Sequence, residues 1–171
     1  MTYHTPLSAD DLERAELLFT QVIVPVMAAE HQAENNPRDG AVLIIRDTED
    51  KEMLRVASGQ ASEEDFAGYD HNADLKNDAL ANHPNIRSSW EVRQGDLSEQ
   101  PYPGSIRTTY DDRFAISGFN WQRDMVGCLW LGWYLRRITM DEVRAIARKS
   151  LDWKVHEPLF NKLNTGAIEI A

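Results

Sequence analysis

Side chains that could carry out chemistry are few in this chain of 171 residues, and the histidines come first. They lie at five scattered positions: His4, His31, His71, His83 and His156. No two of them share one predicted helix face at close spacing, and none clusters with cysteine, so we predict no metal site. His71 is the best candidate for a ligand or acid/base role, because a neutral imidazole binds metal ions and titrates near neutrality. The alternative for His71 is an exposed residue at the start of a helix.

The potential nucleophiles lack the neighbours that would activate them. Ser117 lies in the sequence I-S-G-F, which is not the G-x-S-x-G elbow, and the spacing places no His or Asp beside it. Cys128, the single cysteine, lies in an apolar segment whose one nearby basic residue is Arg123. We therefore predict a small buried apolar residue at Cys128 rather than a reactive thiol. No catalytic residue is predicted, and an enzyme is the least supported class of function.

Charged residues suggest one further kind of site. Lys76, Arg107 and Arg113 would form a basic spot for an anionic ligand if the fold brings them together. With His71 they are the predicted ligand-binding residues. The acidic run Glu63-Glu64-Asp65 lacks the alternating ligand spacing of a calcium loop, and a solvated loop is expected there.

Aromatic residues recur at helical spacing late in the chain. Trp130, Trp133 and Tyr134 fall on one helix face together with Leu129. Aromatic surface of this kind fills cores, anchors interfaces or lines ligand pockets. Core packing is the default interpretation, and a homo-oligomer interface and a ligand pocket stay open as alternatives.

Composition limits the partners. The formal net charge is −10 and the pI is about 4.9, which argues against nucleic acid and anionic lipid as partners, since both require clustered Lys and Arg. One cysteine forms no internal disulfide, so a reducing compartment is expected. The first residues lack a secretory pattern, and no apolar run nears the ~20 residues that span a bilayer. We predict a cytoplasmic protein that does not contact membranes.

The first half of the chain predicts a helix followed by a hairpin. Ser8 is a candidate N-cap with Asp11 three residues on, and apolar residues then recur at helical spacing as far as Met27. Pro25 should kink or split this helix because it has no N–H to donate. The short apolar run 41–46 predicts a buried strand, with a return strand over 52–57.

The middle of the chain is less regular. An acidic, glycine-containing loop is expected over 58–70, and a helix over 70–81. Trp90–Arg93 would form a short strand. Pro101 and Pro103 predict a turn or an extended entry into the next strand.

A second hairpin is expected over 105–117, with the Asp111-Asp112 pair at its turn. The period then changes, so a helix should begin near Asp124, and a capping box from Thr139 to Glu142 predicts another that ends near residue 149. Residues 1–151 are expected to form one domain, and 152–171 a tail that packs on it or on a partner. This order predicts an α+β fold, an antiparallel sheet with helices packed on it.

This order of elements, with the stretches AVLIIRDTEDKEMLRV and RFAISGF, resembles the GlcG/PduO C-terminal-like family of haem-binding and haem-degrading-like domains. The matching features are Ile116-Ser117-Gly118 at a strand end, Asp124 at the opening of the next helix, and Lys76 in the preceding one. The resemblance implies a profilin-like sheet, homo-oligomeric assembly and haem as a candidate ligand. The chain departs from the family where Pro103-Gly104 replaces a Gly-Gly pair, and where Glu49-Asp50 replaces a glycine-bearing turn.

These observations predict a homo-oligomeric binding module that holds a small molecule, with haem as a candidate, between helix and sheet. The alternative is a protein-interaction module without a small ligand, which uses its acidic surface and the segment after Asp152 to contact a protein partner.

Overall fold

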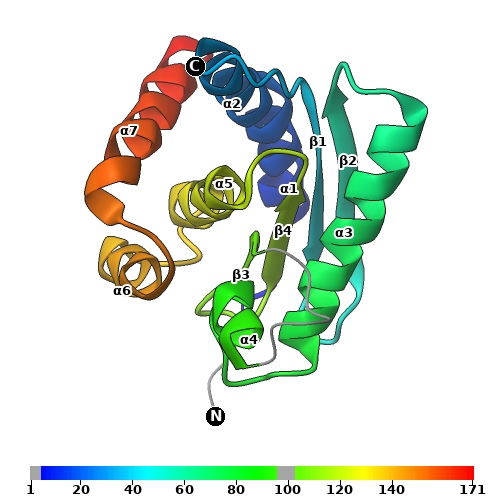
Figure 1. The fold of residues 1–171 in the computed structure, drawn as a ribbon. Helices are drawn as coiled ribbons and strands as arrows, with labels where there is room; N and C mark the ends of the chain where they lie inside the picture. The colour runs from blue at the N-terminus through cyan, green and yellow to red at the C-terminus, as the bar shows by residue number, and fades with distance from the viewer. Residues whose placement is uncertain (1–4, 96–102) are drawn as a thin grey trace.

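The computed structural model describes residues 5–95 and 103–171, which form a four-stranded sheet with helices on both faces (Figure 1). The strands are β1 (Gly40–Arg46), β2 (Glu52–Gly59), β3 (Ser105–Arg107) and β4 (Arg113–Ser117). Their order across the sheet is β2-β1-β4-β3, and every neighbouring pair is antiparallel. The predicted α+β fold with an antiparallel sheet is confirmed.

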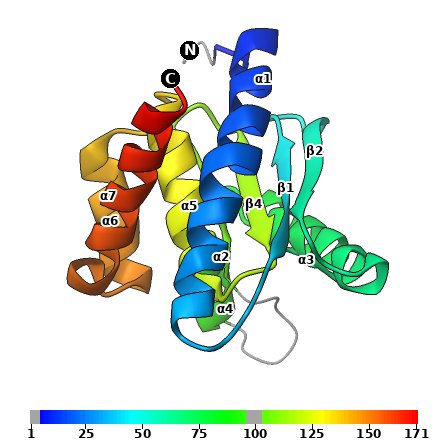
Figure 2. The same ribbon diagram turned by 90° about the horizontal axis from the view of Figure 1, so that it is seen from above.

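Helices lie in layers on the two faces of this sheet. They are α1 (Ala9–Leu18), the π-helix η1 (Phe19–Ile23), α2 (Val24–Ala33), α3 (Glu63–Ala81), α4 (Ser89–Gly95), α5 (Trp121–Tyr134), α6 (Met140–Ser150) and α7 (Trp153–Glu169). Figure 2 shows α3 on one face, and α1, α2 and α5 on the other. Helices α6 and α7 form a further layer outside α5 (Figure 2).

The first helix begins as predicted and changes its hydrogen bonding before the proline. The Ser8 side chain accepts from the Asp11 N–H and the Asp11 side chain accepts in return, which forms a capping box. Pro25 has no N–H to donate to a carbonyl of the preceding helical turn. One turn upstream the chain widens into η1, where the Val24 N–H donates to Phe19 O, five residues back. In place of the predicted kink or split at Pro25, the chain forms one continuous helical segment that contains a π-helical turn.

Both hairpins form, and each has an aspartate in the left-handed conformation at its turn. Asp50 has φ 63° in the first turn and Asp111 has φ 64° in the second. The Asp111-Asp112 turn is thus confirmed, because aspartate tolerates this conformation better than most residues. Strand β3 ends at Arg107, earlier than predicted, because Thr108 already bonds across the turn to Asp112 O.

Three sequence predictions are corrected. Residues 63–70 are helical, because the Ser62 hydroxyl caps α3 by accepting from the Asp65 N–H, and no neighbour lies near Gly68 that would prevent a helix. Trp90–Arg93 lies in helix α4 instead of a strand. Helix α5 begins at Trp121, before Asp124, because the Asn120 side chain caps it. The predicted turn at Pro101 lies outside the described residues.

The two faces of the sheet bury different kinds of side chain. The face under α5 and α1 is apolar and carries Leu43, Ile45, Ile106, Phe114 and Ile116. The face under α3 has only a small apolar cluster of Val42, Ile44, Ala73 and Ala115. Beside that cluster, Arg46, Arg113 and Arg107 stand in register across β1, β4 and β3. Neighbouring arginines repel each other across the strands. Their positive charges therefore need compensation by aspartates on α3 and in the hairpin turns.

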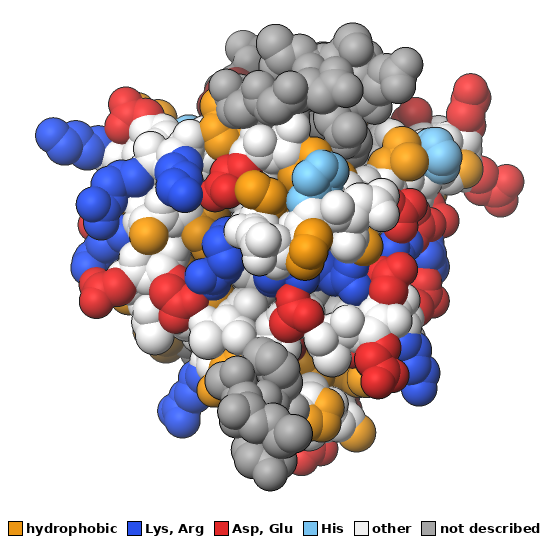
Figure 3. All heavy atoms as spheres, turned by 90° about the horizontal axis from the view of Figure 1, so that it is seen from below, with side chains coloured by type: hydrophobic (Ala, Val, Ile, Leu, Met, Phe, Trp, Pro, Cys, Tyr) orange, Lys and Arg blue, Asp and Glu red, His pale blue; other side chains and the backbone are white. Residues whose placement is uncertain are grey.

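The segment after Asp152 forms helix α7, which packs on α5, α2 and η1. It buries Leu159, Phe160, Leu163 and Ala167 in the main core. Within the described residues, no helix combines the length and apolar character needed to cross a membrane. The face in Figure 3 shows Asp and Glu gathered on the side of α3, whereas Lys and Arg are more frequent on the side of α6.

Candidate functional site

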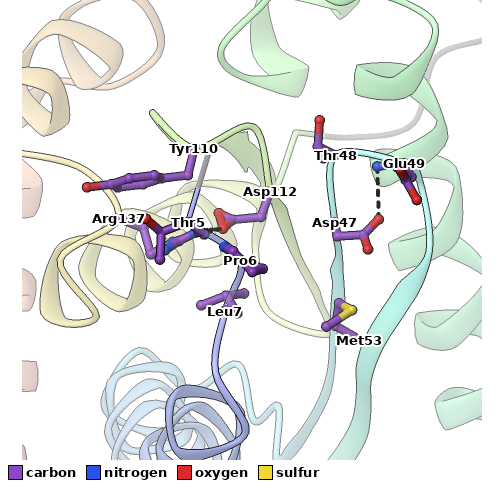
Figure 4. Close-up of a pocket in the computed structure, with 10 residues that line it drawn as sticks. All are labelled: Thr5, Pro6, Leu7, Asp47, Thr48, Glu49, Met53, Tyr110, Asp112 and Arg137. Carbon is purple, nitrogen blue, oxygen red and sulfur yellow. Dashed lines mark hydrogen bonds and ion pairs between the residues drawn. The ribbon is translucent and has the colours of Figure 1, made fainter. Parts of the chain in front are cut away.

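A hollow of about 230 Å³ opens at the end of the sheet where the two hairpin turns lie beside residues 5–7 (Figure 4). Its walls come from the segment before α1, the β1–β2 hairpin, the β3–β4 turn and Arg137, which lies three residues after the end of α5. The lining residues are Thr5, Pro6, Leu7, Asp47, Thr48, Glu49, Met53, Tyr110, Asp112 and Arg137.

One wall is built on a buried ion pair. Asp112 Oδ2 accepts from Arg137 Nε at 2.8 Å and from Nη2 at 2.6 Å, and both side chains are at least 93% buried. The other carboxylate oxygen accepts from the Thr108 hydroxyl. Arg137 Nη2 also donates to Thr5 O at 2.7 Å, which ties the N-terminal segment to the wall. A buried pair with these additional bonds is satisfied, so the wall is electrically neutral and held in place.

The backbone at the end of α5 sets the direction of Arg137. Arg136 takes the left-handed conformation with φ 60°, and the Arg137 N–H returns to Gly132 O at 2.8 Å. This is the Schellman pattern of helix ends. The Arg137 guanidinium lies 4.1 Å from the centre of the Tyr110 ring, a cation–π contact that orients the ring along the hollow.

The facing wall is acidic at its rim and apolar below. Asp47 Oδ1 accepts from the backbone N–H groups of Glu49 and Lys51, each at 2.9 Å, which shapes the turn. The Thr48 hydroxyl donates to Asp111 Oδ2 at 2.7 Å. Figure 4 shows Asp47, Thr48, Glu49 and Met53 on this side, and Tyr110, Asp112 and Arg137 on the other. The lining residues include no histidine or cysteine, so the hollow offers apolar contact and hydrogen bonding.

The four predicted ligand-binding residues do not meet in this hollow. His71 is exposed on α3. Lys76, Arg107 and Arg113 are buried on the α3 side of the sheet, and each forms an ion pair with a different carboxylate. None of the four lines this hollow, the hollow beside Arg14 and Trp133, or the hollow beside Thr109 and Ile138.

Lys76 contacts the other two features on which the sequence resemblance rests, the strand end at Ile116 and Asp124 in the next helix. Its ammonium group donates to Ile116 O at 2.7 Å and to Asp124 Oδ2 at 3.1 Å, and both side chains are at most 3% exposed. Asp124 Oδ1 also accepts from the Phe119 N–H at 3.1 Å. Lys76 on α3 therefore reaches past the end of β4 to the first turn of α5, and connects helices on opposite faces of the sheet.

Two glycines leave the space that this connection needs. Gly104 has φ 149°, and a Cβ there would lie 2.5 Å from Lys76 Nζ. Gly118 has φ 143°, and a Cβ there would lie 2.4 Å from Gly40 O. The glycine of Ile116-Ser117-Gly118 is thus required by backbone conformation and by the close approach of β1.

Burial is the largest influence on the pKa of Asp124. It raises this pKa from 3.8 to about 6, against the opposing effect of Lys76. Burial also raises the pKa of the Cys128 thiol well above its usual range. Cys128 is buried, as predicted, and its Sγ contacts Gly104 O at 3.3 Å. Lys76, Asp124 and Cys128 are all buried.

Arg107 and Arg113 hold loops on the same side of the sheet. Arg107 pairs with Asp111 and donates Nη2 to Leu80 O at the end of α3. Arg113 donates Nη2 to Asp47 O at 2.9 Å and lies 3.0 Å from Asp50 Oδ1. The Nε of Arg113 is buried without a hydrogen-bond partner among the described residues. Arg107 therefore holds the β3–β4 turn, and Arg113 holds the β1–β2 turn.

The three aromatic residues of α5 differ in burial. Trp130 is fully buried in the main core, and its indole N–H donates to Asn164 Oδ1 on α7 at 2.7 Å. Trp133 is partly buried and packs its ring against Phe160 at 5.3 Å. Tyr134 is also partly buried and lies 5.1 Å from the Trp130 ring. Trp130 and Trp133 thus pack against α7 of the same chain.

The residues of the hollow are not predicted from the sequence. The local pattern indicates a turn at Asp112 and gives Arg137 no role. The available signal is weak: a polar Arg136-Arg137 pair directly after an apolar helix. The partner of Arg137 lies 25 residues earlier, so only the packed structure identifies it.

His31 is a second residue whose role depends on tertiary contacts. It is fully buried in α2, its Nε2 accepts from the Asn120 N–H at 3.3 Å, and its Nδ1 lies 3.1 Å from Arg123 Nη1. Arg123 also forms an ion pair with Glu34. Burial, with the nearby Arg123 charge, lowers the pKa of His31 from 6.5 to about 4. Both ring nitrogens face N–H donors, and a second ring proton would remove the one acceptor that the neutral ring offers, so the neutral ring is favoured.

We expect His31 to make the fold less stable as the pH falls from about 6.5 to about 4. The folded-state pKa is depressed, so the unfolded chain binds the proton first, and stability is lost by at most about 3 kcal/mol. An NMR titration should place the His31 midpoint near 4. Urea unfolding of His31→Gln should show a smaller loss over this range. An ordinary midpoint near 6.5 would contradict the prediction.

Among the described residues, no group of three or more His, Cys, Asp or Glu side chains is arranged to hold a metal ion.

A scan against models of protein families finds none that matches the chain, and a search of curated proteins finds no match. Among solved structures, the chain is similar to Ybr137w protein at 15% sequence identity and a TM-score of 0.43, over 73% of this chain and 84% of that chain. It is also similar to Klebsiella pneumoniae protein ORFY, whose description is family-model DUF336, at 11% identity and a TM-score of 0.48. That likeness covers 70% of this chain and 88% of ORFY. DUF336 is the GlcG-like family named by the sequence resemblance, but neither likeness assigns the chain to a family.

Proposed function

We propose that the protein binds a small molecule in the hollow of Figure 4, and that the ligand has an apolar body and a cationic or hydrogen-bond-donating end. The observation that carries this proposal is the composition of the two walls. One wall is a neutral, fully paired Asp112–Arg137 unit with the Tyr110 ring beside it, and the other combines Met53 with an acidic rim.

Charge and size define the ligand further. Asp47 and Glu49 are the lining carboxylates that no arginine of the hollow neutralises, and the net charge of −10 adds a long-range preference for cations. The volume of about 230 Å³ is below the roughly 300–1,000 Å³ of sites for drug-sized ligands. A single ring or a short alkyl chain with an amine or hydroxyl group fits this description.

Three matched probes test the proposal: benzylamine, benzyl alcohol and benzoate. We expect NMR shifts at Tyr110 and Met53 that saturate at the lowest concentration for the amine and at the highest for benzoate, because the rim is negative. Met53→Trp should remove binding by filling the hollow. Leu75→Trp, at an exposed position on α3, is the matched control and should leave binding unchanged. Equal response to the three probes, or binding that survives Met53→Trp, would count against the proposal.

Haem, homo-oligomeric assembly and a cytoplasmic location stay predictions from the sequence. His71 lies away from the hollow, so haem bound through His71 would occupy a different surface. A homo-oligomer interface would also need a surface other than Trp130, which is fully buried in the main core and bonded to α7.

A further inference from the structure

A second hollow, of about 370 Å³, lies where α1 meets the end of α5, and it differs in chemistry from the one in Figure 4. It is lined by Arg14, Trp133, Tyr134 and Arg136. It shares no lining residue with the first hollow. A third hollow of about 240 Å³ shares Trp133 and Arg136 with it, and its lining includes Glu142.

The charge around this second hollow is unusual for the chain. Arg14 and Arg136 are both exposed, and neither forms an ion pair with a carboxylate of the described residues. By contrast, Arg107, Arg113 and Arg137 are each paired. No acidic residue lines the hollow, although acidic residues outnumber basic ones by ten in the whole sequence, 28 against 18. Its electrostatic preference is for an anion.

Arg136 takes a conformation that disfavours a side chain. Its φ of 60° is the left-handed region at the position after α5, where glycine is the usual residue. A non-glycine residue there is strained, and the exposed Arg136 side chain makes no hydrogen bond with the described residues that would offset the strain. The strained residue places a guanidinium at the hollow, which glycine would not provide.

The two aromatic residues provide a flat surface beside these charges. Trp133 packs against Phe160 at 5.3 Å and lies 6.4 Å from the Tyr134 ring, so its orientation is set by the core. No hydrogen bond from the Trp133 indole N–H or the Tyr134 hydroxyl is found within the described residues. All four lining residues can therefore donate hydrogen bonds, and none carries a negative charge at neutral pH.

We propose that this hollow binds a small molecule with a planar ring and an anionic group, either a carboxylate or a phosphate. The ring would stack on Trp133, and the guanidinium groups of Arg14 and Arg136 would hold the anion through charge-assisted hydrogen bonds. This site is separate from the proposed function above, which concerns a ligand of opposite charge in another hollow.

The test titrates the protein with 1-naphthoate and with AMP, and follows the indole N–H signal of Trp133 by NMR. The uncharged partners 1-naphthalenemethanol and adenosine are the matched probes. We expect each bound anion to be held roughly tenfold or more tighter than its uncharged partner, and the difference to shrink at high salt. Binding of naphthoate alone identifies a carboxylate ligand, binding of AMP alone identifies a phosphate ligand, and binding of both shows that the shared chemistry is recognised.

Arg136→Gly is the decisive variant, because glycine keeps the left-handed backbone and removes only the guanidinium. It should weaken anion binding roughly tenfold or more while the thermal midpoint stays the same or rises. Arg148→Ala, which removes an exposed arginine from α6, is the control and should not change binding. The proposal fails if neither anion shifts the Trp133 signal, or if Arg136→Gly binds both anions as the unaltered chain does.

Discussion

Replacing Lys76 with methionine is expected to lower the free energy of unfolding at neutral pH by about 3–5 kcal/mol. The substitution keeps the length of the side chain but leaves the Asp124 carboxylate buried without its cation. It also removes the donor that satisfies Ile116 O at the end of β4. For a domain of this size the loss corresponds to roughly 10 °C in the thermal midpoint, which urea titration and calorimetry can both measure.

The pH dependence distinguishes this mechanism from a simple loss of packing. The folded-state pKa of Asp124 is already raised to about 6 by burial, and removal of Lys76 should raise it further. The folded variant then holds a proton that the unfolded chain releases, so its stability increases as the pH falls. The penalty of Lys76→Met should therefore be smaller near about pH 5 than near about pH 8.

A double variant provides the control. Lys76→Met with Asp124→Asn removes both charges and keeps the oxygen that accepts from the Phe119 N–H. It should recover a large part of the lost stability, because a buried pair often contributes little beyond the mutual compensation of its charges. A penalty below about 1 kcal/mol for Lys76→Met, or the same penalty at both pH values, would show that the carboxylate reaches water.

Replacing Trp130 with alanine is expected to cost about 3–5 kcal/mol, because it empties the space of the largest fully buried side chain in the core. The variant also leaves Asn164 Oδ1 without the indole donor that links α5 to α7. The loss should appear in urea unfolding, and amide exchange in α7 should accelerate, because that helix packs on α5.

Trp133→Ala is the matched comparison, since Trp133 lies one helical turn further along α5 but is only partly buried. It should cost clearly less than Trp130→Ala. Trp130→Phe should lie between the two, because it keeps most of the volume and removes the indole N–H. If Trp130→Ala instead dissociated a homo-oligomer and left the fold equally stable, Trp130 would belong to an interface.

Local features of the fold could be predicted wherever the decisive contact spans only a few residues. The predicted N-cap at Ser8 and the predicted capping box at Thr139 both form, since each joins groups three residues apart. The strand at 41–46 is recognisable from its branched apolar residues, because β1 is buried on both faces, with α3 on one side and α2 on the other. The Asp111-Asp112 turn follows from the same local chemistry.

Predictions failed where packing or a less obvious cap decided the outcome. The stretch from Glu63 to Asp70 has weak periodicity and a glycine, yet it is helical because Ser62 caps it and Phe66 and Tyr69 pack on the small apolar cluster under α3. Trp90 favours a strand by its type, but α4 buries Val92 against Leu80 of α3. Tertiary contacts override intrinsic propensity in both cases.

The sequence by itself determined the two hairpins, the first helix, the caps at Ser8 and Thr139 and the negative net charge, because these depend on composition and on contacts within a turn. The tertiary structure decided which charges meet. Lys76 and Asp124 are 48 residues apart, Asp112 and Arg137 are 25 apart, and no local pattern predicts either pair. A buried charge must find a partner wherever the packed elements place one, so the same packing paired Lys76, Arg107 and Arg113 with carboxylates and left Arg14 and Arg136 facing a hollow.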